Sequence, residues 1–228
     1  MIRLGITGTD TGVGKTVVSA AIVALLRRRG VDVAAMKPAE TGRTPDDPQS
    51  DAALLRAAAG DRDPVDLVRP ILLPEPLAPW VAAERAGAPI DLGRLDDAFA
   101  RLTAGREAVV VEGAGGLLVP ITRDLAYDGL FARWGLDVVI VAGNRLGVLN
   151  HSLLTLHAAR AAGLHVRGII LNALTPAATD VAEDTNLHVL RELAGIPVLP
   201  FPWIDGPATP ERLADAAESA GLGAMVGV

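Results

Sequence analysis

The stretch Gly8-Thr9-Asp10-Thr11-Gly12-Val13-Gly14-Lys15-Thr16 decides the fold of this chain of 228 residues. An apolar run, Ile2–Thr7, precedes it, and Val17–Arg29 follows with the apolar spacing of a helix. Glycines ahead of Lys-Thr, between a strand and a helix, are typical of a phosphate-binding P-loop, because backbone N–H groups and the helix N-terminus then face the phosphates. We therefore expect Lys15 to reach the β- and γ-phosphates and Thr16 to bind Mg²⁺.

The glycine spacing departs from the strict G-x-x-x-x-G-K-[ST] pattern. Counting back five positions from Gly14 gives Thr9, so Gly8 stands one place early. The alternative to a P-loop is an ordinary glycine-rich turn between a strand and a helix. The order of strand, loop and helix favours the P-loop.

Short apolar runs alternate with helical stretches along the rest of the chain. We expect strands at Ile2–Thr7, Val31–Met36, Ala108–Val111, Val138–Ala142 and Gly168–Leu171. We expect helices at Val17–Arg29, Leu92–Leu102, Val148–Ala162, Asp180–Leu193 and Pro210–Ala220, the last being the one helix expected after Gly206. This alternation predicts an α/β fold in which a mostly parallel sheet carries helices on both faces. Residues 1–228 are expected to form a single domain.

The stretch Thr41–Pro89 differs because seven prolines before Pro89 interrupt it. We expect it to form an insertion over one end of the sheet.

Composition limits the classes of function. The chain has 27 acidic and 21 basic residues, a formal net charge of −6, which disfavours binding to nucleic acid or to anionic membranes. Without cysteine, it has no disulfide scaffold, thiolate metal site or cysteine nucleophile. No apolar run approaches the ~18 residues of a membrane span. A soluble cytoplasmic protein is therefore expected.

Two carboxylates are candidate metal ligands. Glu112 ends an apolar strand and precedes glycines, where α/β sheets place their ligands. Asp51 follows Ser50 and opens a helical run, Ala52–Ala59. The alternatives are that Glu112 caps a turn and that Asp51 interacts with the helix dipole.

Lysine is rare in this chain, since 19 of the 21 basic residues are arginine. The two lysines are Lys15, in the P-loop, and Lys37, which follows the second strand. A compact ammonium contacts phosphate at a single point, which the arginine fork does not imitate. We interpret Lys37 as a second phosphate-handling residue. The alternative is a surface lysine.

A further glycine-rich strand exit, Gly143–Gly147, precedes a helix that carries Asn150. Its free N–H groups suit a carboxylate, although an ordinary loop has the same sequence features.

Several motifs together resemble the dethiobiotin synthetase family. They are Thr7-Gly8-Thr9-Asp10-Thr11-Gly12-Val13-Gly14-Lys15-Thr16, Lys37-Pro38-Ala39-Glu40-Thr41-Gly42, Ser50-Asp51-Ala52, Val111-Glu112-Gly113-Ala114-Gly115-Gly116 and Leu146-Gly147-Val148-Leu149-Asn150-His151. Their order and spacing cover nearly the whole chain, and the early glycine of the loop is normal in this family.

The resemblance implies an ATP-dependent ligase that closes a cyclic urea on 7,8-diaminononanoate with CO₂. It implies nucleotide binding by Gly12, Val13, Gly14, Lys15, Thr16, Val17, Asp51, Glu112, Gly113, Ala114, Gly115, Asn172, Pro202, Trp203 and Ile204. It implies Mg²⁺ binding by Thr16, Asp51 and Glu112, catalytic roles for Lys37, Lys15 and Thr11, and substrate binding by Thr41, Gly147, Val148 and Asn150. Family members are homodimers, so a homodimer is expected.

Two other classes use related folds. Partition and positioning ATPases normally carry a lysine early in the loop, where this chain has Asp10. Cobyrinate-amidating enzymes need a cysteine nucleophile, which this chain lacks.

Overall fold

The computed structural model describes residues 1–177 and 181–228. Its strands are β1 (Ile2–Gly8), β2 (Val33–Met36), β3 (Ala39–Thr41), β4 (Ile71–Leu73), β5 (Ala108–Gly116), β6 (Asp137–Gly143), β7 (Val166–Asn172) and β8 (Val198–Phe201). Its helices are α1 (Lys15–Arg28), α2 (Asp51–Ala59), α3 (Val65–Val68), α4 (Pro79–Arg85), α5 (Leu92–Thr103), α6 (Tyr127–Arg133), α7 (Val148–Ala161), α8 (Val181–Leu193), α9 (Pro210–Ser219) and α10 (Leu222–Val226).

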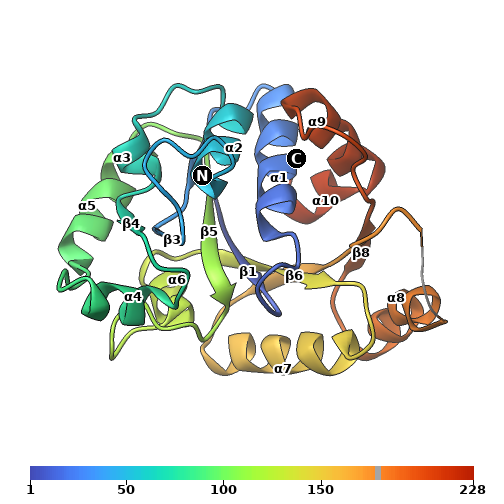
Figure 1. The fold of residues 1–228 in the computed structure, drawn as a ribbon. Helices are drawn as coiled ribbons and strands as arrows, with labels where there is room; N and C mark the ends of the chain where they lie inside the picture. The colour runs from blue at the N-terminus through green and yellow to red at the C-terminus, as the bar shows by residue number, and fades with distance from the viewer. Residues whose placement is uncertain (178–180) are drawn as a thin grey trace.

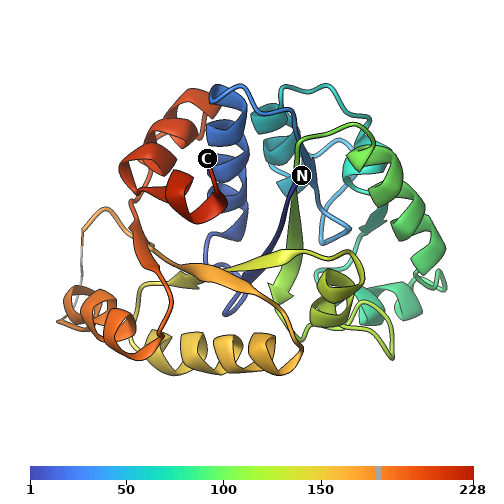
Figure 2. The ribbon, with the colours of Figure 1, turned by 180° about the vertical axis from the view of Figure 1, so that it is seen from behind.

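The main sheet is parallel, with strand order β2-β5-β1-β6-β7-β8 (Figure 1). One face packs against α1, α2, α9 and α10, and the other against α5, α6, α7 and α8. The view from behind shows α7 and α1 on opposite faces of the sheet (Figure 2). The predicted α/β fold with helices on both faces is confirmed.

The five predicted strands and five predicted helices are present, with small differences at their ends. Asp180, expected to begin a helix, lies outside the described residues, and α8 is described from Val181. The strand expected from Val31 begins at Val33, because the Val31 N–H closes the end of α1 on the Leu26 carbonyl. Strand β5 continues through its glycines to Gly116.

Two expectations are wrong. The segment Thr41–Pro89 is more than an insertion over one end of the sheet, because α2 buries Leu55 and Ala58 in the core beside α1. The chain after Gly206 adds two helices, α9 and α10, where one was expected. Edge strand β8 was missed because Pro200 lies within it, and proline is rare inside strands except at sheet edges.

Strands β3 and β4 form a separate parallel pair beside the main sheet, joined by the short helices between them. Among the described residues, none of the helices is long and apolar enough to cross a bilayer.

Candidate active site

The P-loop links the carboxyl end of β1 to α1. Gly12 and Gly14 have φ of 74° and 87°, a region that glycine enters without the strain of a side chain. A Cβ on Gly14 would lie 2.2 Å from the Asn172 amide nitrogen, so a larger residue there would have to displace the Asn172 side chain. The first turn of α1 carries no acidic residue, and its N–H groups have no acceptors within the helix. The loop therefore has the features of an anion site.

Lys15, the first residue of α1, is buried and donates a hydrogen bond from Nζ to the Asp10 carbonyl at 3.0 Å. Burial lowers the pKa of Lys15 to about 8, and repulsion from Lys37 contributes to this shift. A nearby anionic phosphate would favour the charged ammonium.

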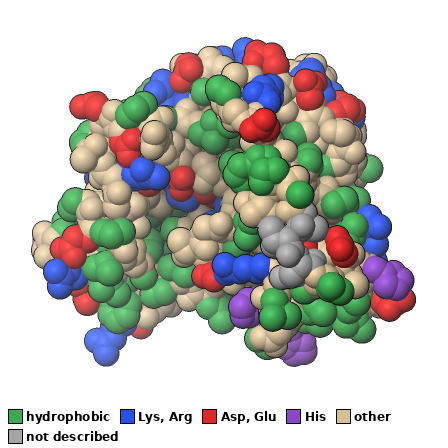
Figure 3. Space-filling view, turned by 45° about the vertical axis from the view of Figure 1, so that its right-hand side comes forward, with side chains coloured by type: hydrophobic (Ala, Val, Ile, Leu, Met, Phe, Trp, Pro, Cys, Tyr) green, Lys and Arg blue, Asp and Glu red, His purple; other side chains and the backbone are tan. Residues whose placement is uncertain are grey.

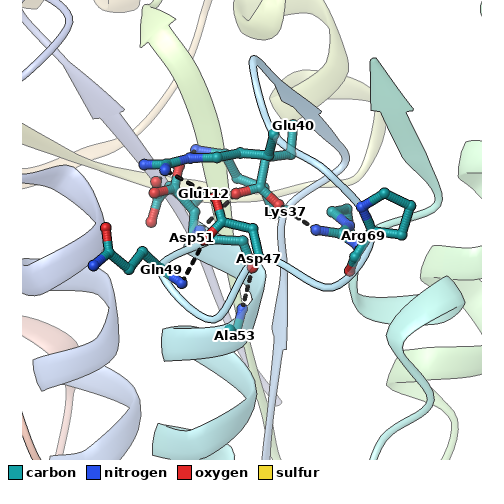
Figure 4. A network of polar contacts seen from close by, with 11 residues as sticks. Lys37, Glu40, Asp47, Gln49, Asp51, Ala53, Arg69 and Glu112 are labelled. Carbon is teal, nitrogen blue, oxygen red and sulfur yellow. Dashed lines mark hydrogen bonds and ion pairs between the residues drawn. The ribbon is translucent and has the colours of Figure 1, made fainter. Parts of the chain in front are cut away.

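Lys37 follows β2 and points into the same region. Its Nζ lies 2.7 Å from Asp51 Oδ2 and 2.6 Å from Glu112 Oε1, and it donates to the Gly113 carbonyl at 3.2 Å (Figure 4). Burial alone would lower the pKa of Lys37, but attraction to Glu112 and Asp51 outweighs burial and holds the pKa above its usual value. Lys37 is therefore a buried cation, and the interpretation of it as a surface lysine is wrong.

Thr16, Asp51 and Glu112 converge from α1, α2 and β5. Glu112 is fully buried, and its Oε1 accepts a hydrogen bond from the Thr16 hydroxyl at 2.9 Å. Burial raises the pKa of Asp51, but attraction to Lys37 and hydrogen bonds from Lys37 and Thr16 leave it below its usual value. Both carboxylates are therefore held next to the P-loop.

This cluster has the donor chemistry of a magnesium site. Glu112 Oε2 is buried and has no hydrogen-bond partner among the described residues. Two carboxylates and a hydroxyl are hard oxygen ligands, and Mg²⁺ usually takes one or two carboxylates and completes its shell with water and phosphate. Within the described residues, no group of three or more His, Cys, Asp or Glu side chains is placed to hold a metal; in this cluster the third oxygen belongs to Thr16, which is hydrogen-bonded to Glu112.

A cleft of about 760 Å³ opens over these groups. Of the residues expected at the site, it is lined by Thr11, Gly12, Gly14, Lys15, Thr16, Val17, Lys37, Thr41, Asp51, Glu112, Ala114 and Gly115. Val13 is buried behind the loop, and Gly113 packs against the Tyr127 ring.

The cleft also includes residues for which no role was expected. They are Glu40, Arg43, Pro76, Leu77, Ala78, Pro79 and Val119. The proline-rich segment gives no helical or strand periodicity from which its wall position could be predicted. Only Glu40 lies inside one of the family motifs, and its place in that motif was the one sequence feature that could have indicated a role at the site.

The remaining expected residues lie outside the cleft lining. Asn172, at the end of β7, donates from Nδ2 to the Val13 carbonyl at 3.0 Å, behind the P-loop. Pro202, Trp203 and Ile204 follow β8, and Phe201 at its end is in register with Asn172. Of these residues, Asn172 contacts the P-loop, and the other three continue from the neighbouring edge strand.

The glycine-rich exit of β6 leads into α7, and Gly147 caps the helix with φ of 93°. The Val148 N–H is already bonded to the Arg145 carbonyl at 3.1 Å, and the Asn150 side chain is exposed. Arg145 pairs with Asp10 at 2.9 Å, which links this turn to the P-loop. The helix end therefore lies beside the loop and outside the cleft.

Similar proteins of known name cover most of the chain. A family model described as an AAA domain matches residues 3–205. An ATP-dependent dethiobiotin synthetase BioD of Anaeromyxobacter dehalogenans (strain 2CP-C) is 42% identical over 89% of this chain and 91% of its own length. The protein of the same name from Bacillus cereus (strain G9842) is 36% identical over 93% and 88%.

Solved structures with the same fold are more distant in sequence. The septum site-determining protein MinD of Pyrococcus horikoshii OT3, complexed with Mg-ADP, has a TM-score of 0.56 at 19% identity, covering 99% of this chain and 93% of that one. A ParA family ATPase of Chlorobium tepidum TLS has a TM-score of 0.53 at 19% identity, covering 99% and 97%. These two share the fold. The sequence identity to the two curated relatives extends over nearly the whole length of the chain and therefore shows the family as well as the fold. This chain belongs to the ATP-dependent dethiobiotin synthetase family.

Proposed function

We propose that this protein is an ATP-dependent dethiobiotin synthetase, a ligase of biotin synthesis that acts on 7,8-diaminononanoate, CO₂ and ATP. One observation carries the proposal: the buried ammonium of Lys37 lies with Asp51 and Glu112 beside the P-loop. Phosphoryl transfer depends on positioning and charge neutralisation, and this cluster provides both.

The proposed reaction makes three bonds in order. One amine of the diamine adds to the carbon of CO₂ and loses a proton, which gives a carbamate. A carbamate oxygen then attacks the γ-phosphorus of ATP and displaces ADP. The second amine attacks the carbamoyl carbon, expels inorganic phosphate, loses a proton and closes the cyclic urea.

The residues of the cleft have separate roles in this proposal. The N–H groups of Gly12–Thr16 would bind the triphosphate, with Lys15 beside the transferred group. Lys37 would neutralise the carbamate and the phosphoryl oxygens, and Thr11 and Thr41 would contact the carbamate or the diamine. Thr16, Asp51 and Glu112 would hold Mg²⁺. When bound, the ion would offset charge on the phosphate oxygens.

The base of the nucleotide would lie at the sheet edge formed by the ends of β7 and β8. Asn172 already contacts the P-loop there, and Pro202, Trp203 and Ile204 continue from β8. Ala114 and Gly115, which line the cleft, would face the phosphates from β5, and Gly113 precedes them in the strand.

We further propose that residues 1–228 form one domain, that the protein is a homodimer, and that it acts in the cytoplasm, where ATP is available. Gly147, Val148 and Asn150 would bind the distant carboxylate of the diamine, and the Val148 N–H would exchange its bond to the Arg145 carbonyl for one to this carboxylate. Their place outside the cleft supports a dimer in which the helix end of one subunit reaches the cleft of its partner. Leu146 and Leu154, exposed by 80% and 61%, lie on the same turn and helix and suit such an interface.

The switch ATPases that share the fold are the other candidate class. Asp10, where that class normally carries a lysine, pairs with Arg145 and accepts the Thr11 N–H. Figure 3 shows acidic and basic side chains interspersed over the face in view, in keeping with the formal charge of −6. These features favour the synthetase.

The test is release of phosphate by purified protein with MgATP and bicarbonate, with and without the diamine, together with mass spectrometry of the product. We expect phosphate release that depends on the diamine and a product with the mass of dethiobiotin. Phosphate release at the same rate with and without the diamine, and no product with the mass of dethiobiotin, would refute the proposal.

A further inference from the structure

Glu40 belongs to a motif of the family resemblance, yet nothing in the proposed chemistry uses it. Its side chain is 2% exposed and lies at the edge of the cleft. Glu40 Oε2 lies 3.0 Å from the Arg69 guanidinium, whose side chain is 5% exposed. The other oxygen, Oε1, accepts a hydrogen bond from the backbone N–H of Asp51 at 2.5 Å (Figure 4). The carboxylate is therefore held on both sides.

Arg69 connects this pair to the loop that leads into α2. Its second terminal nitrogen donates to the Pro45 carbonyl at 3.0 Å. The adjoining segments are fixed by backbone bonds, from the Lys37 N–H to the Val68 carbonyl at 2.7 Å and from the Ile71 N–H to the Pro38 carbonyl at 3.3 Å. Glu40 is thus anchored in a rigid frame, while the loop after Thr41 contains exposed residues.

A buried ion pair contributes little net stability compared with apolar side chains of similar volume, because desolvation offsets the attraction. What Glu40 provides is an acceptor at a fixed place for the first N–H group of α2. Asp51 is the first residue of that helix, and its carboxylate lies 2.7 Å from Lys37. A shift of the helix start would move this carboxylate away from Glu112 and Thr16.

We propose that Glu40, held by Arg69, is a positioning residue that fixes Asp51 for divalent-cation binding. Glu40 touches neither nucleotide nor metal in this proposal and acts through the Asp51 backbone. The inference rests on the proposed function only in taking Asp51 as a metal ligand. Groups that orient metal ligands typically contribute about 10–100-fold to metal affinity.

The experiment uses Mn²⁺ as a paramagnetic probe with ADP, and electron paramagnetic resonance reports the free ion. We expect Glu40→Ala to weaken Mn²⁺ binding by about tenfold or more, as an outer-shell loss does. The affinity for ADP without metal should be unchanged, because the P-loop binds the phosphates. Glu40→Gln keeps an acceptor oxygen for the Asp51 N–H but no longer carries a charge opposite Arg69. Its Mn²⁺ affinity should therefore fall measurably, but by less than that of Glu40→Ala.

Two further variants calibrate the result. Asp51→Asn gives the loss of Mn²⁺ affinity that is expected when the metal-binding carboxylate itself is changed. Asp63→Asn breaks the Arg106–Asp63 ion pair, which lies away from the cleft lining, and should lower stability without changing Mn²⁺ affinity.

Wild-type Mn²⁺ affinity in Glu40→Ala overturns the inference, as does an equal loss in Asp63→Asn. If Glu40→Ala does not fold, wild-type affinity in Glu40→Gln overturns it. No diamine enters the experiment, so a chain that makes no dethiobiotin but loses Mn²⁺ affinity in Glu40→Ala would refute the proposed function and leave this inference standing.

Discussion

Replacing Lys37 by glutamine should make the folded protein depend on a divalent cation for its stability. Lys37 is the buried cation between Asp51 and Glu112. Without it, two carboxylates face one another next to the P-loop, and Glu112 is fully buried. A cation held by the same carboxylates would replace the missing charge.

The size of the effect follows from the burial of the three groups. Removing one partner of a buried ion pair costs about 3–5 kcal/mol. Asp51 has a side chain that is 31% exposed, so water screens part of the repulsion, and we take the lower end, about 3 kcal/mol. In a domain of this size, that loss corresponds to a fall in Tm of about 6–12 °C.

Thermal unfolding followed by circular dichroism, in EDTA and then in MgCl₂, measures this dependence. Mg²⁺ at a hundred times its Kd would return about 2.7 kcal/mol to the variant. The wild type should gain less, because the ion must displace the ammonium of Lys37. Asp63→Asn serves as the matched control, since it breaks the Arg106–Asp63 ion pair and should be destabilised equally with and without Mg²⁺.

The reasoning is wrong if Lys37→Gln unfolds in EDTA at the wild-type temperature. It is also wrong if Mg²⁺ raises the Tm of wild type and variant equally. Turnover should fall by orders of magnitude in the same variant while ATP still binds, and full activity would refute the proposed role of Lys37.

Two further predictions concern the P-loop. Because the pKa of Lys15 is about 8 in the folded protein, the unfolded chain binds more protons above pH 8, so the free energy of unfolding should rise by about 2 kcal/mol between pH 8 and 10. Urea unfolding should show this rise in the wild type, and the same rise in Lys15→Met would contradict the assignment of the pH dependence to Lys15. Gly14→Ala should lower both the Tm and the affinity for ATP, because its Cβ would meet Asn172 at 2.2 Å. Gly30→Ala is the control: its φ is 81° and no atom lies within 4 Å of its Cβ, so it should lose only the backbone strain energy of about 1–2 kcal/mol. Equal Tm losses in the two glycine variants would show that the contact with Asn172 has no effect.

The parts of the protein that could be predicted are those whose sequence signal is local. The P-loop could be predicted because its glycines, lysine and threonine act through neighbouring backbone positions. The strands and helices of the main sheet could be predicted because burial imposes a periodicity on apolar residues. Lys37 was found through the rarity of lysine. Asp51 and Glu112 were candidate metal ligands through their positions at a helix start and a strand end, and the motif resemblance added a shared Mg²⁺ site with Thr16.

Which of these residues contact one another depends on long-range packing of the chain. Lys37 and Glu112 are 75 residues apart in the chain, and parallel pairing of β2 with β5 places them at the same end of the sheet. No local pattern encodes the Glu40–Arg69 pair, because its partners come from separate segments joined by tertiary contacts. The proline-rich wall of the cleft could not be predicted either. Its backbone is irregular and is positioned by packing, so its sequence lacks the periodicity on which local prediction depends.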